Sequence, residues 1–408
     1  MISFQDRLDA TANHPRGFDY LRLVLAVSVI AFHGILVCYG EHAEKSFWTG
    51  PLHPLAFFVV PSFFALSGFL VASSLERNTI SQFLSLRVIR IFPALAVETV
   101  ISALVLGPLL TVVPLWQYFS NIRFFKYFLN IIGDIHYTLP GVFDGLPDPN
   151  IVNIQLWTVP IELSCYIAIT LLALLGITKR PAWLLSVACV GVLLSALLQY
   201  LGLWDIHFDT IPPRRFMLLS FLFGASFFVL RKNIPYSFLL SLISLISYSV
   251  LVSKPETLIL SSLPLVYITV FVGLLNPPWT PLIVAADYSY GVYLYGFPLQ
   301  QSFSYMLPSY RIWIVNVLLS TVLALGCAFL SWTFVESKVL SKKQQILSFV
   351  TAISERIQMH LASIGRLFSP AEACVALLSR TPSHPLPSVV TVDAFRNDAV
   401  ARDDDSQS

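Results

Sequence analysis

Apolar residues gather in long runs along most of this chain, and short polar stretches separate the runs. A run of roughly 17 to 25 such residues is long enough for an α-helix to cross the hydrocarbon core of a bilayer. We therefore predict an all-α integral membrane protein with about ten transmembrane helices. The predicted segments are 19–39, 54–75, 91–113, 153–176, 182–202, 214–231, 236–253, 258–276, 281–301 and 312–335.

Basic residues between these segments predict the orientation of the chain, because Lys and Arg concentrate in cytoplasmic loops. Most of them fall on alternate sides of successive segments and therefore on one face. These residues are Arg7, Arg16, Arg77, Arg87, Arg90, Lys179, Arg180, Arg231, Lys232, Lys338, Lys342 and Lys343. Arg123, Lys126, Arg214 and Arg215 oppose the pattern. The larger group predicts that both termini are cytoplasmic.

We divide the chain into a transmembrane domain, residues 1–340, and two C-terminal segments. Residues 341–368 place apolar side chains at helical spacing with charges between them, which predicts an amphipathic cytoplasmic helix. Residues 369–408 are rich in proline and serine and predict a disordered tail. The connection from about 114 to 152 is the longest between predicted spans. Its aromatic and basic first half fits a helix lying in the membrane interface.

Composition narrows the chemistry. Hydrophobic residues make up 56% of the chain and charged residues 12%, against roughly 25% charged residues in globular domains. The 5 cysteines form no CxxC pair, so neither a disulfide framework nor a metal site is indicated. The sequence contains no glycine-rich phosphate loop and no basic-aromatic patch for nucleic acid. We therefore predict no metal, no bound cofactor and no nucleic-acid partner.

The segment Phe18–Gly34 is apolar enough for a bilayer, yet it contains Asp19, Arg22 and His33. Ionisable residues inside a spanning helix are costly and by default mark a functional site. Arg22 and His33 are close to three helical turns apart, so both point to nearly the same face, about 16 Å apart. Asp19 lies on that face and can pair with Arg22. The alternative is a snorkelling Arg22 and a hydrogen-bonded core His33, but the shared face favours function.

A second group follows the second predicted span. Arg87 and Arg90 are three positions apart, so on a helix they form a double guanidinium at the cytoplasmic surface. Two guanidinium groups suit phosphate oxygens, which arginine binds in a bidentate way. The positive-inside rule also explains arginines here, but it explains their pairing less well. We expect a new helix to begin near Pro93, and upstream Ser67 and Gly68 permit close helix approach.

Carboxylates and tyrosines near other predicted helix ends add candidates. Glu162 follows Trp157 and lies shallow in the membrane at the outer start of the fourth predicted span. A carboxylate at that depth pairs with an arginine or faces a cavity. Tyr293 belongs to a tyrosine-rich stretch, 287–301, which lines a sugar-binding groove or forms part of an aromatic belt. Glu336 ends the last predicted span on the inside, where a plain helix-end carboxylate is the simpler interpretation.

These stretches resemble, in order, the motifs of the membrane acyltransferase-3 family, polytopic enzymes that O-acylate glycans, lipid-linked sugars and some small molecules. The spacing of Arg22 and His33 resembles the family's Arg-x10-His signature. Its FFxLSGFL, RxxRxxP, LWSLxxExxxY, SYxxYLxHxP and FVExP segments are similar here to FFALSGFL, RVIRIFP, LWTVPIELSCY, YSYGVYLYGFP and FVESK. The resemblance covers about residues 17–340. Gly296 stands where the family often has His, and Ser337 replaces the Pro after FVE.

The resemblance implies cytoplasmic acyl-CoA, most commonly acetyl-CoA, as co-substrate and a sugar hydroxyl in a glycan or glycolipid as acceptor. His33 would be the general base or the acyl-carrying nucleophile, and Arg22 would orient it or stabilise the oxyanion. Donor binding falls to Arg87, Arg90 and Glu336, and acceptor binding to Glu162, Trp157 and Tyr293. The expected location is the bacterial inner membrane, among membrane lipids, with the oligomeric state left open.

Two other classes of function compete with this one. A secondary transporter that exports a glycan or small molecule would also contain intramembrane charges, but the sequence shows no internal repeats of the transporter type. A non-catalytic subunit that anchors a polysaccharide synthase through its C-terminal helix would lose activity only when residues 344–408 are deleted. Hydrolysis of acetyl-CoA by the purified protein separates an enzyme from a transporter.

Overall fold

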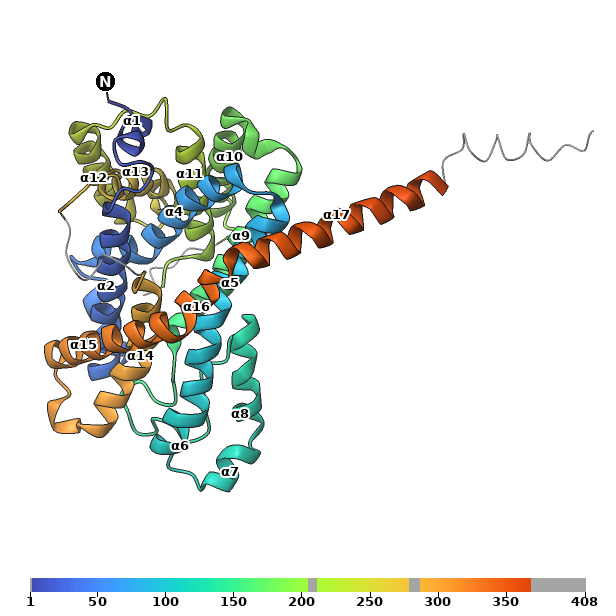
Figure 1. Cartoon of the computed structure of the whole chain (residues 1–408). Coiled ribbons are helices and arrows are strands. Elements are labelled where there is room, and N and C mark those ends of the chain that lie inside the picture. Colours follow the sequence, from blue (N-terminus) through green and yellow to red (C-terminus); the bar gives the residue numbers. More distant parts are fainter. Residues whose placement is uncertain (1, 205–210, 279–286, 368–408) are drawn as a thin grey trace, which may run out of the picture. The chain divides into compact units, whose positions relative to one another are not determined.

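The computed structural model describes residues 2–204, 211–278 and 287–367. Within these ranges the chain is helical, and its extended pairings are two isolated bridges. The α-helices are α1 (Phe4–Asp9), α2 (Gly17–Tyr39), α3 (Glu41–Trp48), α4 (His53–Arg77), α5 (Ile80–Ile101), α6 (Gly107–Leu110), α7 (Leu115–Ser120), α8 (Ile122–Tyr127), α9 (Thr158–Leu174), α10 (Pro181–Tyr200), α11 (Arg214–Val229), α12 (Phe238–Val252), α13 (Ser262–Gly273), α14 (Ser289–Met306), α15 (Trp313–Ser331), α16 (Ser337–Ser341) and α17 (Lys343–Leu367) (Figure 1). Short 3₁₀ segments are Phe128–Ile132, Ile154–Trp157, Ile177–Lys179, Leu258–Ser261 and Pro308–Tyr310. The prediction of an all-α protein is confirmed for the described ranges.

Six helices of the described chain are long and apolar enough to cross a membrane. They are α2, α4, the stretch Ile80–Leu110 that contains α5 and α6, the stretch Ile154–Leu174 that contains α9, α10, and the stretch Trp313–Ser341 that contains α15 and α16. The other four predicted segments correspond to the shorter helices α11, α12, α13 and α14. The chain is therefore a multi-pass membrane protein. The count of about ten spans and the cytoplasmic termini stay predictions.

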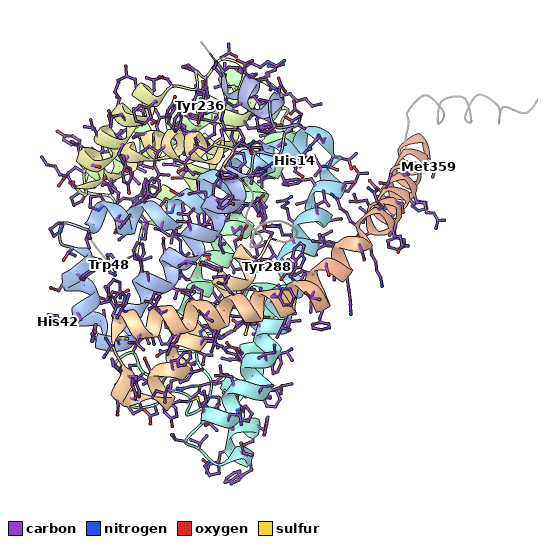
Figure 2. All side chains as sticks on the ribbon, turned by 60° about the vertical axis from the view of Figure 1, so that its left-hand side comes forward. His14, His42, Trp48, Tyr236, Tyr288 and Met359 are labelled. Atoms are coloured by element: carbon purple, nitrogen blue, oxygen red, sulfur yellow. The ribbon has the colours of Figure 1, made fainter. Side chains whose placement is uncertain are left out.

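The chain divides into two compact units, Met1–Thr351 and Ala352–Ser408. All sites considered below belong to the first unit. Helix α17 corresponds to the predicted amphipathic segment 341–368 and exposes apolar side chains such as Phe349 and Met359, the latter labelled in Figure 2. Its cytoplasmic location stays a prediction. The predicted tail, 369–408, lies outside the described residues.

The helix that contains the two neighbouring arginines begins at Ile80, well before the predicted start of the third span. Thr79 caps it: its side-chain oxygen accepts the Gln82 N–H at 3.4 Å, and the Gln82 side chain accepts the Thr79 N–H at 3.1 Å. This reciprocal capping box satisfies two N–H groups at the helix start. A polar cap therefore decides where α5 begins, and the onset of the long apolar run does not.

One expectation was wrong for this reason. Pro93 lies inside α5 and not at the beginning of a new helix. Arg87 and Arg90 lie three positions apart on one helix, as expected, and this helix is the long α5. Both side chains therefore project from a regular helix some way inside it, where neighbouring helices can hold them.

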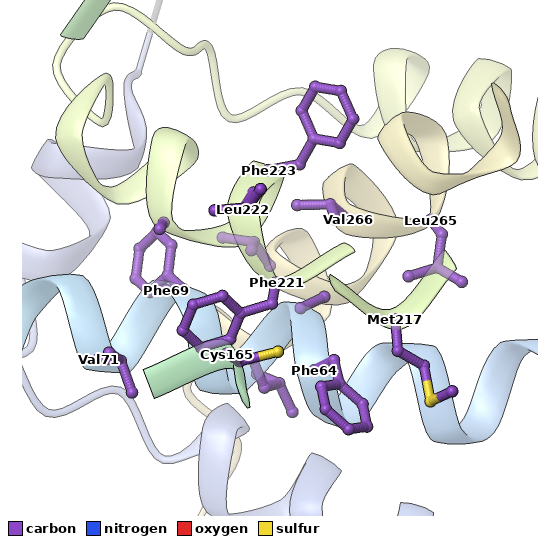
Figure 3. Packing of buried hydrophobic residues seen from close by; sticks show 14 of the residues in the cluster. Phe64, Phe69, Val71, Cys165, Met217, Phe221, Leu222, Phe223, Leu265 and Val266 are labelled. Atoms are coloured by element: carbon purple, nitrogen blue, oxygen red, sulfur yellow. The ribbon is translucent and has the colours of Figure 1, made fainter. Parts of the chain in front are cut away.

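Helices α4 and α11 cross at two glycines. A Cβ atom on Gly68 would lie 1.9 Å from the carbonyl oxygen of Phe221, and one on Gly224 would lie 2.1 Å from that of Ala65. No side chain fits in either place, so the backbones touch directly. The predicted close approach at Gly68 is confirmed. Large aromatic residues close the core around this crossing (Figure 3).

A proline interrupts the backbone hydrogen bonding of α14. Pro298 has no N–H, so it leaves the carbonyl of Leu294 without its usual helical donor. The Gln155 amide donates to this carbonyl at 3.0 Å and to that of Tyr293 at 2.8 Å, and the Asn153 amide donates to Leu294 at 3.3 Å. The chain just before α9 is thereby attached to the middle of α14.

Candidate active site

Arg22 and Arg90 converge on one carboxylate. Arg22 on α2 donates through Nη1 to Asp287 Oδ2, and Arg90 on α5 donates through Nη2 to the same oxygen. Asp287 precedes α14, next to Tyr288, which is labelled in Figure 2. The Asp287 side chain is 17% exposed, so the ion pairs are shielded from bulk water. Arg22, which was predicted to act in catalysis, and Arg90, which was predicted to bind the donor, therefore share Asp287 as their ionic partner.

Asp19 supplies a second, weaker partner to Arg22. Its Oδ1 accepts Arg22 Nη2 at 3.2 Å, as predicted from the spacing of three residues. The Asp19 side chain is 50% exposed, so water weakens this pair. Asp287 is the stronger partner of Arg22 because it is the more buried carboxylate.

The sequence interpretation did not single out Asp287. The signal that could have found it is its isolation: it is the sole acidic residue between Glu256 and Glu336. A lone carboxylate in so long an apolar stretch needs a cationic partner. The sequence cannot say which arginine supplies the charge, because the three helices involved meet only in the folded chain.

Arg87 has a different environment from Arg90. Its guanidinium carbon lies 5.7 Å from the ring centroid of Phe83 and 5.8 Å from that of Tyr166. No carboxylate of the described chain lies within salt-bridge distance of Arg87, and its buried Nε makes no hydrogen bond there. A guanidinium held between aromatic faces with unused donors can accept an anion.

Glu162 lies closer to the arginines than its predicted acceptor role suggested. The Tyr166 hydroxyl, one helical turn further along α9, donates to Glu162 Oε1. Glu162 also lies within electrostatic range of Arg90 and Tyr290. The carboxylate is thus part of the same polar interior as the predicted donor-binding residues.

Glu336 lies at the end of the π-helical segment Trp332–Glu336, where the regular helix is interrupted. Its side chain is buried, Ser331 Oγ donates to it at 3.1 Å, and Arg90 and Asp287 are within electrostatic range. Such π-helical turns are frequent at functional sites. Glu336 is therefore a buried carboxylate beside the arginine cluster, and the plain helix-end interpretation does not describe it.

His33 lies on α2, eleven residues beyond Arg22, and the helix is continuous between them. Their separation along the helix is therefore about 16 Å, as expected from the helical rise. The His33 ring packs edge-on against Phe297 of α14, with ring centroids 5.4 Å apart. Its Nδ1 is buried and makes no hydrogen bond to the described residues. A ring that is fixed by packing and not by a hydrogen-bonding partner is available to a substrate.

Tyr293 and Trp157 lie where α9 and α14 meet. The Tyr293 hydroxyl contacts the Thr158 hydroxyl at 2.7 Å and donates to the Gln155 carbonyl at 2.8 Å. Trp157 is partly buried against the main hydrophobic core. Both residues therefore have structural contacts of their own.

The structure thus brings together Arg22, Arg90, Glu336 and Glu162, and Asp287 joins the first two. It places His33 apart from them, along α2. This divides the site into a charged cluster and a separate imidazole, connected by one continuous helix.

These features define a multi-pass membrane protein with ionisable side chains gathered among its helices. A model of the acyltransferase-3 family, described as an acyltransferase domain, matches residues 16–333. The chain therefore belongs to this family and is an acyltransferase. It is also 29% identical over 352 residues to an O-acetyl transferase of Shigella phage Sf6, covering 81% of this chain and 98% of the relative. No solved structure matches.

Proposed function

We propose that this chain transfers an acetyl group from cytoplasmic acetyl-CoA to a hydroxyl of a sugar. The acceptor would belong to an exopolysaccharide, O-antigen or lipo-oligosaccharide at the bacterial inner membrane. The observation that carries the proposal is the continuous α2, which holds Arg22 in a charged cluster at one end and His33 about three turns further along. Family membership and the O-acetyl transferase relative support acyl transfer to oxygen.

The donor's phosphates would bind at the arginines of α5. Arg87 is the first candidate because its guanidinium has unused donors and no carboxylate partner in the described chain. Arg90 uses Nη2 for Asp287, and a guanidinium has five N–H donors in total, so it can contribute to the same anion. Glu336 lies within electrostatic range of Arg90 and would add negative charge near it.

The chemical step would take place at His33. The acceptor hydroxyl oxygen attacks the thioester carbonyl, the new C–O bond forms, and the C–S bond breaks. His33 takes the hydroxyl proton and returns it to the departing thiolate, so the products are the ester and coenzyme A. Alternatively, His33 itself takes the acyl group first. Arg22 lies about three turns from His33 and is bonded to Asp287 and Asp19, so it would help to hold the donor and would not act on the reacting atoms.

The acceptor would approach from the side where α9 begins. Trp157 offers an apolar face, and Tyr293 and Glu162 offer a hydroxyl and a carboxylate to sugar hydroxyls. Because Glu162 also lies within electrostatic range of Arg90, it would bring the acceptor close to the donor-binding residues.

The first test is turnover of acetyl-CoA by the purified protein. Arg87→Ala should raise the KM for acetyl-CoA by about 10- to 100-fold, since it removes charge-assisted hydrogen bonds of about 1.5–3 kcal/mol. The kcat should change much less, because the lost contact is with the phosphates and not with the reacting atoms. Arg77→Ala is the matched control: within the described chain the Arg77 side chain donates to Ser73, on the same helix α4, and its loss should leave both constants unchanged. Wild-type protein that neither transfers nor hydrolyses acetyl-CoA would favour a transporter.

A further inference from the structure

Both oxygens of the Asp287 carboxylate are occupied by donors. Oδ2 accepts from Arg22 and Arg90, and Oδ1 accepts the Ser289 hydroxyl at 2.5 Å. Three donors from three directions leave the carboxylate little freedom to rotate. Asp287 is therefore a fixed anion rather than a solvent-exposed side chain that meets an arginine by chance.

The three residues come from three helical elements that are distant in the sequence. Arg22 is near the start of α2, Arg90 is midway along α5, and Asp287 stands immediately before α14. The contact between Tyr290 and the Ile91 carbonyl, at 3.1 Å, joins α14 to α5 next to the same cluster. A single carboxylate thus sets how two guanidinium groups from different helices lie relative to one another.

We infer that Asp287 is a positioning residue for donor binding: it holds the guanidinium groups of Arg90 and Arg22 together, where both can meet the donor's phosphates. This inference rests on the proposed function. Without the carboxylate charge, two guanidinium groups that share one oxygen would repel each other at close range, where the interior screens them poorly. Arg22 would keep only the half-exposed Asp19, and Arg90 would lose its partner. The donor would then bind more weakly.

The prediction for Asp287→Asn follows from this role in donor binding. Asn keeps the shape of the side chain and removes only the charge, so the KM for acetyl-CoA should rise at least about fivefold, whereas the kcat per folded protein should change much less, because the reacting atoms lie at His33. Asp287→Glu keeps the charge and should recover part of the lost affinity. A residue that merely supports the fold would lower the amount of folded enzyme without moving KM. Glu76→Gln is the matched control, because Glu76 forms an ion pair with Arg231 away from this cluster.

A double-mutant cycle on thermal unfolding in detergent tests the contact independently of activity. If Arg22 and Asp287 act as a pair, the double variant Arg22→Gln/Asp287→Asn should lower the melting temperature clearly less than the two single variants do when their decreases are added. Asp287→Asn combined with Glu76→Gln should be additive. Additive effects for Arg22 and Asp287, or a KM of Asp287→Asn within twofold of wild type, would overturn the inference and leave the proposed function standing. A wild-type protein without acetyl transfer would overturn the proposed function and, with it, the positioning role.

Discussion

The candidate active site consists of single ionisable residues, and each of them is energetically costly to hold among apolar helices. Arg22, Arg90 and Asp287 reduce that cost by pairing. Arg87 reduces it by lying against aromatic rings. His33 is held by packing alone within the described chain. Arg87 and His33 therefore have groups available to a substrate, and Arg22 and Arg90 can use the N–H donors that Asp287 leaves unused.

Glu44 offers a pH-dependent prediction outside the membrane-spanning helices. It lies in α3, is 9% exposed, and its burial, together with Asp148 and Glu41, raises its pKa to about 7. Burial next to Glu41 likewise raises the pKa of Asp148 to about 6. A raised carboxyl pKa stabilises the fold below the unfolded pKa, 4.5 for Glu44, and this contribution is lost as the pH rises through about 7.

Glu44→Gln should therefore stabilise the protein at pH 8, by on the order of 2–3 kcal/mol, and should have little effect near pH 4.5. Melting temperatures of the detergent-purified protein across this range would show it. Glu256→Gln, at the exposed Glu256, is the control for loss of a surface carboxylate and should change the melting temperature little. A gain in stability with Glu44→Gln that does not depend on pH would contradict this account.

At the scale of elements, the hydrophobic pattern predicted correctly which segments are helical, and it predicted less well where the helices begin. Helix α2 was expected at 19–39 and occupies Gly17–Tyr39, because its apolar run and its helical length coincide. Helix α5 starts much earlier than its apolar run, because Thr79 and Gln82 cap it and the intervening polar residues hide the helix from a hydropathy count. The arginines were expected on a helix at the cytoplasmic surface between two spans, and their partial burial against neighbouring helices could not be predicted.

The α4–α11 crossing gives a prediction at this scale. Gly68→Ala places a Cβ atom against the backbone of Phe221, which cannot move aside as a side chain would. The two helices must separate, and we expect a loss of about 1–3 kcal/mol or more, measured as a lower melting temperature in detergent. Gly326→Ala in α15 is the matched control: among the described residues, no atom outside the local backbone of α15 lies within 4 Å of the added Cβ. Ala favours a helix over Gly, so this control should be neutral or slightly stabilising. Equal changes in melting temperature for the two substitutions would contradict the direct backbone contact between α4 and α11.

At the scale of the whole molecule, the order of the motifs along the chain indicated the family more specifically than any single motif did. The sequence named Arg22, His33, the arginines of α5, Glu162 of α9 and Glu336 as candidates. Their grouping could not be predicted, because it depends on which helices are neighbours: Glu162 was expected apart from the donor-binding residues and lies within electrostatic range of Arg90. Asp287, which joins two of the groups, became visible only in the fold.

The whole-molecule account requires a donor on one side of the membrane and acceptor chemistry reached through the helices. Inverted and right-side-out vesicles that contain the protein, supplied externally with radiolabelled acetyl-CoA, test this most directly. With wild-type protein, label should appear on carbohydrate in inverted vesicles, whose cytoplasmic face is accessible, and not in right-side-out vesicles. His33→Ala should abolish the label, whereas His42→Ala, at the exposed His42 of α3 (Figure 2), should leave it unchanged. If His33→Ala, at equal membrane abundance, labelled carbohydrate as strongly as the wild type, the mechanism would be contradicted. If the label did not depend on vesicle orientation, the cytoplasmic location of the donor site would be contradicted.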